Sequence, residues 1–442
     1  MGSSARAGRP AGWPTVADLV ILSCVAVLTG QLARLPIAGV GEKEAPLLFT
    51  DLLIGLTLAG GSWVLIRERR FSLDRVALAT LAFASVGGLS TVASVVRFDL
   101  SAVELLFSLA YLARWLFVFG LYLVVVNCVR ASEVERIWTW LERAVMLFAA
   151  FGILQAALLP DFAFIVYPDA RPYLDWDPQG HRLVSTLLDP NFSGMLLATI
   201  LLVQAGRMAF GVPVPAWRVL LVATALVLTL SRSSILATLV GVVVILGVRG
   251  TSRRLWITGA ALTAGAVITS PWWVPFALSF NKFAIDDPSG LYRLIQWGWA
   301  LIILMDHPIT GVGFNAYGFV HQRYVFSSST PATFGLDGGL LFVAVMTGLL
   351  GLAIFCLLLA SVVRTARAGW ESRDVAPELR GIALGAGALV PAATVHSMFA
   401  NTLLYVPLLH ILWIIWGCAF VVASSRSDRP CATSAPPTSS GR

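Results

Sequence analysis

Charged residues are scarce in this sequence. They make up 12% of its 442 residues, about half of the roughly 25% that is usual in a soluble globular domain. Apolar residues reach 57%, and runs of about 18 residues recur along the chain, each long enough to cross a bilayer as a helix. The short alternating strands typical of a β-barrel are missing from these runs. The composition therefore excludes a soluble enzyme and indicates an all-α integral membrane protein.

Cysteine is also rare, and none of the five cysteines lies in a long loop, so we expect no disulfide framework. No internal repeat is evident. The first apolar run is too long for a cleavable signal peptide. We therefore expect a cytoplasmic tail at residues 1–15, a transmembrane domain at 16–424 and a disordered cytoplasmic tail at 425–442.

Hydropathy predicts about twelve membrane spans. They fall at residues 16–38, 46–66, 74–96, 102–127, 140–160, 190–206, 216–231, 233–249, 255–279, 336–363, 378–397 and 400–423.

Arginine gathers in alternate loops, which predicts the orientation of the bundle. The basic loops hold Arg67 to Arg75, Arg130 and Arg136, Arg207 and Arg218, Arg249 to Arg254, and Arg364 to Arg380. By the positive-inside rule this side is the cytoplasm of a bacterial inner membrane, and both termini lie there. The net charge of +7 thus reflects orientation, and we expect no nucleic-acid binding. The two longest loops, about 160–190 and 281–336, fall on the opposite, extracytoplasmic side, where few arginines are needed for orientation.

The first polar segment on that side runs from His181 to Asn191. Asp189 and Asn191 are residues that cap helices, and Pro190 suits a helix start. Capping does not account for Arg182, which we expect near the membrane surface.

The second polar segment is a tight turn, Leu230 to Ser234, with Arg232 between serines. An arginine near hydrocarbon needs a partner. One interpretation is that Arg232 reaches up to lipid headgroups, and the other is that it binds a phosphate, whose oxygens match a guanidinium.

The third segment combines an amphipathic stretch from Gly290 to Met305 with a turn at residues 307–313. Arg293 and Gln296 interrupt the apolar spacing, so the stretch is expected to lie in the interface with Trp297 and Trp299 at headgroup depth.

The fourth segment is Asp337-Gly338 at the start of a span that contains Gly348 and Gly351. The carboxylate of Asp337 suits a general base or an arginine partner, and it equally suits a helix cap. The two glycines suit a close contact between helices.

Arg114 is predicted near the middle of the fourth span. An intramembrane arginine is a functional candidate, although a structural partner such as Glu104 or Asp51 is equally plausible. No histidine, His321 included, has metal-ligand spacing. The closest acidic pair in an extracytoplasmic loop, Asp286-Asp287, is interpreted as ordinary loop.

Together these segments resemble the O-antigen ligase/O-antigen polymerase family of bacterial surface-polysaccharide synthesis. The resemblance is carried by Arg182 through Asp189-Pro190-Asn191, by Ser231-Arg232-Ser233, by the series from Arg293 to Gly313, and by Gly348 and Gly351. Family ligases carry a His-Asn pair ahead of the last two glycines, whereas this chain has Asp337-Gly338. The difference favours the polymerase branch.

The resemblance implies a fold similar to GT-C-like glycosyltransferases and a membrane enzyme that uses no cofactor or metal. Its substrate would be an undecaprenyl-pyrophosphate-linked oligosaccharide held in the lipid bilayer, with a chain-length regulator or export machinery as possible partners. It implies catalytic roles for Asp337, Arg293 and Arg232, because guanidinium groups stabilise a departing pyrophosphate and a carboxylate takes the proton of the attacking hydroxyl. Substrate binding is assigned to Arg182, Arg232, Arg293, Asn191, His321 and Arg114.

Three other functions stay open at this stage. A ligase that transfers polysaccharide to lipid A core uses the same donor chemistry. A transporter or flippase fits the number of spans, but transporters often show inverted repeats and polar residues at the midplane. A non-enzymatic scaffold for polysaccharide synthesis is the third alternative.

Overall fold

The computed structural model describes residues 15–40, 43–69, 71–167, 182–249, 288–324 and 336–425. The predicted span 255–279 and the two terminal tails lie almost wholly outside these residues. Asp286-Asp287 and His181 lie outside them too. The described part is almost entirely helical, which confirms the expected fold class.

The elements follow one another along the chain with short connections. They are α1 (Val16–Val25), η1 (Ala26–Leu28), β1 (Arg34–Val40), β2 (Lys43–Leu48), α2 (Phe49–Glu68), α3 (Arg75–Phe98), α4 (Ala102–Cys128), α5 (Ala131–Leu158), α6 (Phe162–Val166), η3 (Ser185–Leu187), α7 (Pro190–Ala209), α8 (Ala216–Leu228), α9 (Arg232–Arg249), α11 (Pro288–Asp306), α12 (Tyr317–His321), α13 (Gly339–Glu371), α14 (Pro377–Ser397) and α15 (Val406–Ser424).

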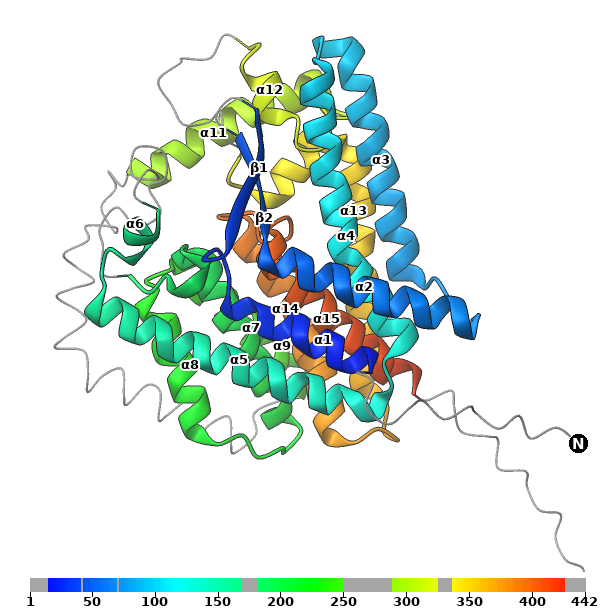
Figure 1. Ribbon diagram of the computed structural model, residues 1–442, viewed down its shortest axis with the longest axis vertical. Helices are drawn as coiled ribbons and strands as arrows, with labels where there is room; N and C mark the ends of the chain where they lie inside the picture. Colours follow the sequence, from blue (N-terminus) through cyan, green and yellow to red (C-terminus); the bar gives the residue numbers. More distant parts are fainter. Residues whose placement is uncertain are drawn as a thin grey trace, which may run out of the picture.

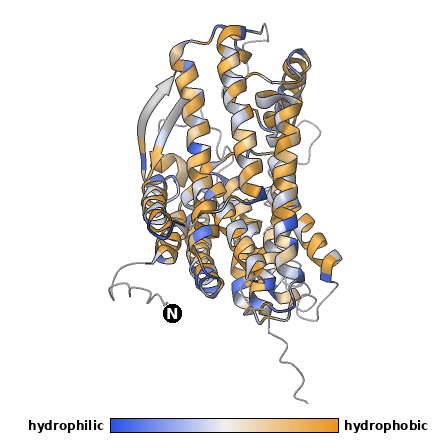
Figure 2. Cartoon of the chain, turned by 90° about the vertical axis from the view of Figure 1, so that its right-hand side faces the viewer, coloured by the Kyte–Doolittle hydropathy of each residue, from blue (hydrophilic) through white to orange (hydrophobic). Residues whose placement is uncertain are grey.

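Among the described residues, nine helices are long and apolar enough to cross a membrane, and Val16–Leu28 and Ala216–Leu228 are shorter apolar helices. Figure 2 shows hydrophobic residues along most of the helix lengths, with hydrophilic residues more frequent near helix ends. The chain is therefore a multi-pass membrane protein. Most predicted spans match a helix to within a few residues, but α5 begins nine residues before the predicted 140–160 span (149 − 140 from Ala131 to residue 140).

The first predicted span, 16–38, is wrong in its second half. The helical part ends at Leu28, and the chain then enters an antiparallel hairpin of β1 and β2. Gly30 adopts a positive φ of 46°, and a Cβ there would meet the carbonyl group of Thr186. Gln31 also donates its backbone N–H to the Thr186 carbonyl, at 2.8 Å. The chain leaves the helix at this close approach, which apolar composition alone does not indicate.

Helix α7 forms the centre of the bundle and is buried along nearly its whole length. It packs against α9 and α14, while α1, α2 and α5 run at an angle to the upright α3 and α4 (Figure 1). Two glycines of α14 allow the closest approach. A Cβ on Gly381 would lie 2.5 Å from Arg207 Cα, and one on Gly385 would lie 2.5 Å from Val203 Cα. Small residues at such contacts let membrane helices pack backbone to backbone.

Helix α13 is broken at Gly348, where φ is 69° and ψ is −178°. The turn at residues 308–313 fills the break. Val312 and Gly313 donate their N–H groups to the carbonyls of Val345 and Met346, each at 2.9 Å, and Leu349 donates to Pro308 at 2.7 Å. Backbone groups in an apolar environment need such partners. The two glycine-containing segments predicted to be a turn and a helix contact therefore form one joint.

Helix α3 supports the same joint with hydroxyl groups. Ser90 Oγ donates to the carbonyl of Met346 at 3.0 Å, and Ser94 Oγ donates to that of Val312 at 2.6 Å. Thr91 Oγ1 accepts the N–H of Phe314 at 2.7 Å. The joint is thus bonded from both α3 and α13.

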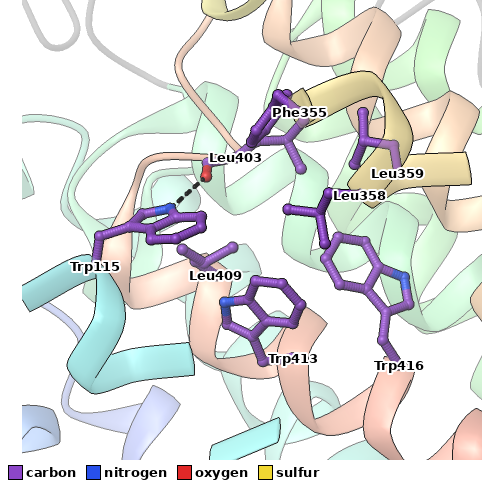
Figure 3. Close-up of a pocket in the computed structure, with 8 residues that line it drawn as sticks. All are labelled: Trp115, Phe355, Leu358, Leu359, Leu403, Leu409, Trp413 and Trp416. Atoms are coloured by element: carbon purple, nitrogen blue, oxygen red, sulfur yellow. Dashed lines mark hydrogen bonds between the residues drawn. The ribbon is translucent and has the colours of Figure 1, made fainter. Parts of the chain in front are cut away.

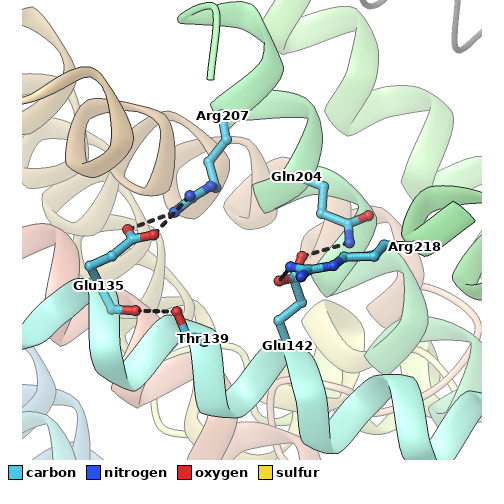
Figure 4. Close-up of polar contacts among 6 residues, drawn as sticks. All are labelled: Glu135, Thr139, Glu142, Gln204, Arg207 and Arg218. Carbon is cyan, nitrogen blue, oxygen red and sulfur yellow. Dashed lines mark hydrogen bonds and ion pairs between the residues drawn. The ribbon is translucent and has the colours of Figure 1, made fainter. Parts of the chain in front are cut away.

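The opposite end of the bundle is bound by ion pairs from α5 (Figure 4). Arg207 forms two bonds to Glu135, at 2.7 and 2.8 Å. Glu142 accepts from Arg218 and from Gln204, each at 2.8 Å. Sequence reasoning assigned both arginines to membrane orientation alone, and the structure shows that they also bind α5 to α7 and α8.

We predict that Gly348→Ala destabilises the protein by roughly 2–4 kcal/mol, because it combines a strained positive φ with a clash in a packed joint. The added Cβ would meet Ile309 O and lie 2.5 Å from Thr310 N. Thermal unfolding of the detergent-purified protein measures the effect. Gly247→Ala, where a Cβ meets nothing within 4 Å, is the control and is expected to be neutral. Equal melting temperatures for both variants would refute the account.

Candidate functional site

Arg293 and Asp337, two of the predicted catalytic residues, lie side by side. Arg293 is on α11 and Asp337 stands just ahead of α13, and Arg293 Nε is 3.4 Å from Asp337 Oδ2. The Asp337 side chain keeps 48% of its exposure. Burial by surrounding protein still raises the pKa of this carboxyl above its ordinary value, and the charge of Arg293 opposes that rise.

Trp297 holds Asp337 in place through the backbone. Its indole N–H donates to the Asp337 carbonyl. Gly338 follows with φ 146°, and a Cβ there would lie 2.9 Å from Trp297 Nε1. Asp337 does not cap α13, since Gly338 occupies the N-cap position and forms no side-chain cap. The capping interpretation of Asp337 is therefore wrong, and Trp297 is a contact of the site as well as an interfacial residue.

Arg182 reaches the turn that carries Arg232. The Arg182 side chain is buried, and its Nε donates to the Thr229 carbonyl at 2.9 Å. Gln155 of α5 fixes the segment after Arg182, because its Oε1 accepts the N–H groups of Val184 and Ser185 at 3.0 and 3.1 Å. The first two polar segments of the sequence are thus brought together.

The turn and the start of α7 share a buried hydrogen-bond network. Ser231 Oγ donates to Asn191 Oδ1 at 2.9 Å, and Ser234 Oγ donates to the Asn191 carbonyl at 3.0 Å. Asn191 is therefore bonded within the protein. Arg232 is the first residue of α9, and its side chain is exposed beside these buried serines. The network fixes the backbone on which Arg232 stands.

Asp189 caps α7, as the sequence indicated, and accepts the N–H groups of Asn191 and Phe192 at 2.7 and 3.0 Å. Burial raises the pKa of its carboxyl. The two N–H groups and the charge of Arg182 lower that pKa, whereas the charge of Asp337 raises it. Asp189 therefore senses both Arg182 and Asp337, which places the two arginine-bearing halves of the site near one another.

The turn between α14 and α15, residues 398–405, joins the halves. His396 Nε2 bonds Ser234 Oγ at 3.0 Å, and its Nδ1 bonds Thr402 Oγ1. Asn401 Nδ2 donates to the Leu336 carbonyl at 2.8 Å. Tyr405 stacks on Phe192, with ring centroids 3.7 Å apart.

Sequence reasoning missed the part that this turn plays. His396 looked like an isolated histidine at a span end, and Asn401 and Tyr405 carried no motif. The available signal was the density of polar side chains between two very apolar spans. We use the name motif end for residues 182–191, 231–234, 336–339 and 396–405.

Arg114 forms a structural ion pair. Its Nη2 is 2.5 Å from Asp51 Oδ2, and Leu48 donates its N–H to the same carboxylate at 2.9 Å. Asp51 was one of the two partners that the sequence suggested. The pair borders the motif end, because the pKa of Tyr405, raised mainly by burial, also responds to the charges of Asp189 and Arg114.

His321 lies in an aromatic environment. Its ring is 5.2 Å from that of Trp299 and 5.5 Å from that of Tyr317. Burial lowers the pKa of His321, which favours the neutral ring. Trp299 thus contacts this buried histidine in addition to any role at the interface.

An apolar cavity lies between α4, α13, α15 and the turn before α15 (Figure 3). Four aromatic rings and four leucines line it, and Trp115 Nε1 donates to the Leu403 carbonyl at 3.3 Å. The lining holds no charged side chain, so this cavity is unsuited to a pyrophosphate. Within the described ranges, no group of three His, Cys, Asp or Glu side chains has the arrangement of a metal site.

The fold and this site define a polytopic membrane protein with a cluster of arginines and carboxylates at one end of its helices. Residues 218–356 match the family model described as O-antigen ligase. This stretch of the chain is an O-antigen ligase family domain, which confirms the resemblance seen in the sequence. No curated protein matches the chain. The matched stretch contains Arg232, Arg293 and Asp337, whereas Arg182 and Asn191 precede it.

Membership in this family makes the chain a membrane glycosyltransferase of the O-antigen ligase or polymerase type.

We predict that His396→Leu destabilises the protein by roughly 1–3 kcal/mol, because it leaves the buried hydroxyls of Ser234 and Thr402 without their bonds. His396→Gln keeps one amide group for Ser234 and should recover part of the loss. Thermal unfolding in detergent measures both variants. A leucine variant as stable as the wild type would show that the His396 bonds contribute nothing.

Proposed function

We propose that the protein transfers a saccharide from a polyprenyl-pyrophosphate carrier, of undecaprenyl type, to the hydroxyl of an acceptor saccharide. The observation that carries the proposal is the pairing of Arg293 with Asp337 in the family-matched stretch. One group suits a departing diphosphate and the other suits a hydroxyl proton, and they lie within a few ångströms of each other.

The chemistry follows from charge. When the glycosidic carbon leaves the carrier, negative charge grows on the diphosphate oxygens, and fixed guanidinium groups stabilise that charge in a partly desolvated site. Arg232 and Arg293 are the proposed donors, and Arg182 is proposed to bind the same diphosphate or to hold the Arg232 turn. Asp337 takes the proton of the attacking hydroxyl. These groups neutralise the leaving group without a metal ion.

Asn191, His321 and Arg114 support this site from farther out. Asn191 fixes the Arg232 turn, His321 packs on α11, and Arg114 holds α4 against α2 through Asp51. We therefore propose positioning roles for these three residues in place of the direct substrate contacts expected from the sequence.

The favoured reaction is repeat-unit polymerisation for O-antigen, capsule or exopolysaccharide, with ligation to lipid A core as the second candidate. Asp337-Gly338 stands where family ligases carry a His-Asn pair, which favours the polymerase. The charge rule further places the motif end at the extracytoplasmic face of the inner membrane. Chain-length regulators or export proteins are possible partners at that face.

A deletion strain distinguishes the two reactions. Loss of long surface chains, with single repeat units retained, is the expected result for a polymerase. Full-length chains that remain on the lipid carrier would instead assign the protein as a ligase. An unchanged surface polysaccharide would contradict both.

We predict that Arg293→Ala and Arg232→Ala each lower the transfer rate by about 10²–10³, the usual effect of removing a donor that stabilises transition-state charge. The assay is extension of a lipid-linked oligosaccharide by the purified variant. Arg323→Ala is the matched control, because Arg323 bonds the Phe319 and Asp99 carbonyls. The mechanism fails if both catalytic variants extend chains at the wild-type rate.

A pH profile tests Asp337. A base works only when deprotonated, and burial raises its pKa, so we expect activity to fall on acidification at a pH above the ordinary carboxyl value of about 4. Asp337→Asn should lower the rate by about 10²–10⁴ and remove this acidic limb from the residual activity. Near-normal turnover by Asp337→Asn would show that the carboxylate only orders the start of α13.

A further inference from the structure

Two guanidinium groups lie on one aromatic ring at the end of the bundle opposite the motif end. Arg249 ends α9, Arg380 lies near the start of α14, and Phe210 is the C-cap residue of α7. The guanidinium carbons are 4.2 Å and 4.5 Å from the Phe210 ring centroid. Three helices that are far apart in the sequence thus direct two cations to one place.

The charges in this cluster repel one another. Arg249 and Arg373 both lie close enough to Arg380 for their charges to act on it. Arg380 also lies near the start of a helix, where the helix dipole disfavours a cation. Cation–π contacts with Phe210 offset part of this cost, but they bring no negative charge.

Other arginines at this end are neutralised by carboxylates. Arg207 and Arg218 pair with Glu135 and Glu142 (Figure 4). Within the described part of the chain, no carboxylate forms an ion pair with the three arginines of the cluster, although Asp374 and Glu378 are nearby in the sequence.

The orientation of the cluster suits an anion. Arg380 Nε is bound to the Trp370 carbonyl at 3.0 Å, which fixes the plane of its guanidinium and leaves its terminal nitrogens for another acceptor. The Arg249 side chain is exposed, and those of Arg380 and Phe210 are partly exposed. The site is therefore accessible from outside the protein, and a guanidinium binds phosphate oxygens in a bidentate manner.

We propose that Arg249, Arg380 and Phe210, with Arg373 nearby, form a binding site for the phosphate of an anionic phospholipid headgroup. The cluster lies at the ends of membrane helices, which is the level of the headgroups. Basic pockets between membrane helices on the cytoplasmic side bind such headgroups. By the charge rule this end faces the cytoplasm, so the lipid belongs to the inner leaflet. The site is separate from the motif end and does not depend on the transfer reaction.

Native mass spectrometry of the full-length protein, released from mixed bicelles of phosphatidylglycerol and phosphatidylcholine, tests the proposal. We expect the wild type to retain phosphatidylglycerol in preference to phosphatidylcholine. Each alanine substitution, Arg249→Ala or Arg380→Ala, should weaken this retention about fivefold. Arg364→Ala removes the same charge from α13 outside the cluster and should retain lipid as the wild type does.

Three results would overturn the proposal. They are wild-type retention of phosphatidylglycerol by both single variants, an equal loss in Arg364→Ala, and equal retention of the two lipids by the wild type. A parallel thermal-shift measurement with millimolar inorganic phosphate separates the sources of phosphate. Stabilisation by free phosphate without selective lipid retention would assign the cluster to a soluble anion and contradict the lipid site. If an alanine variant does not fold, Arg380→Lys replaces it, with an intermediate loss expected and wild-type retention counting against the proposal.

Discussion

The backbone hydrogen bonds between the 308–313 turn and the break in α13 determine where the catalytic candidates lie. A helix interrupted inside an apolar bundle exposes carbonyl and N–H groups that no water can satisfy, so another segment must bond them. Val312 and Gly313 do this for Val345 and Met346. Because α11 leads directly into that turn, fixing the turn also fixes α11 and brings Arg293 beside Asp337. The glycines at 311 and 348 are required because a Cβ on either would collide with the opposing backbone.

The motif end is built from two halves with different physical characters. One half is a buried network of hydroxyl and amide groups that fixes the Arg232 turn against the start of α7. The other half is the partly exposed pair of Arg293 and Asp337. His396 and Asn401 join them from one turn, and Asp189 senses charges from both. A rigid support with exposed cations above it suits a ligand that carries concentrated negative charge, such as a diphosphate.

Much of this arrangement could be predicted from the sequence. Apolar run length located most spans, and residue type identified Asp189 as a cap and Asp51 as a possible partner of Arg114. The resemblance selected Arg232, Arg293 and Asp337, which lie in the family-matched stretch. What failed depends on contacts between distant segments. The end of the first helix is set by an approach to Thr186, and the role of His396 arises from Ser234 and Thr402, none of which periodicity can indicate. Likewise, charge counting treated Arg207 and Arg218 as orientation signals because their partners are on α5.

The central claim is that the motif end performs saccharide transfer from a polyprenyl diphosphate by itself. The most direct measurement uses purified protein in liposomes that contain a radiolabelled lipid-linked oligosaccharide, with no nucleotide and no ion gradient. The account predicts longer saccharide chains and release of the polyprenyl diphosphate in equal amounts. Movement of intact lipid-linked oligosaccharide across the bilayer without any chain growth would contradict it and indicate a flippase.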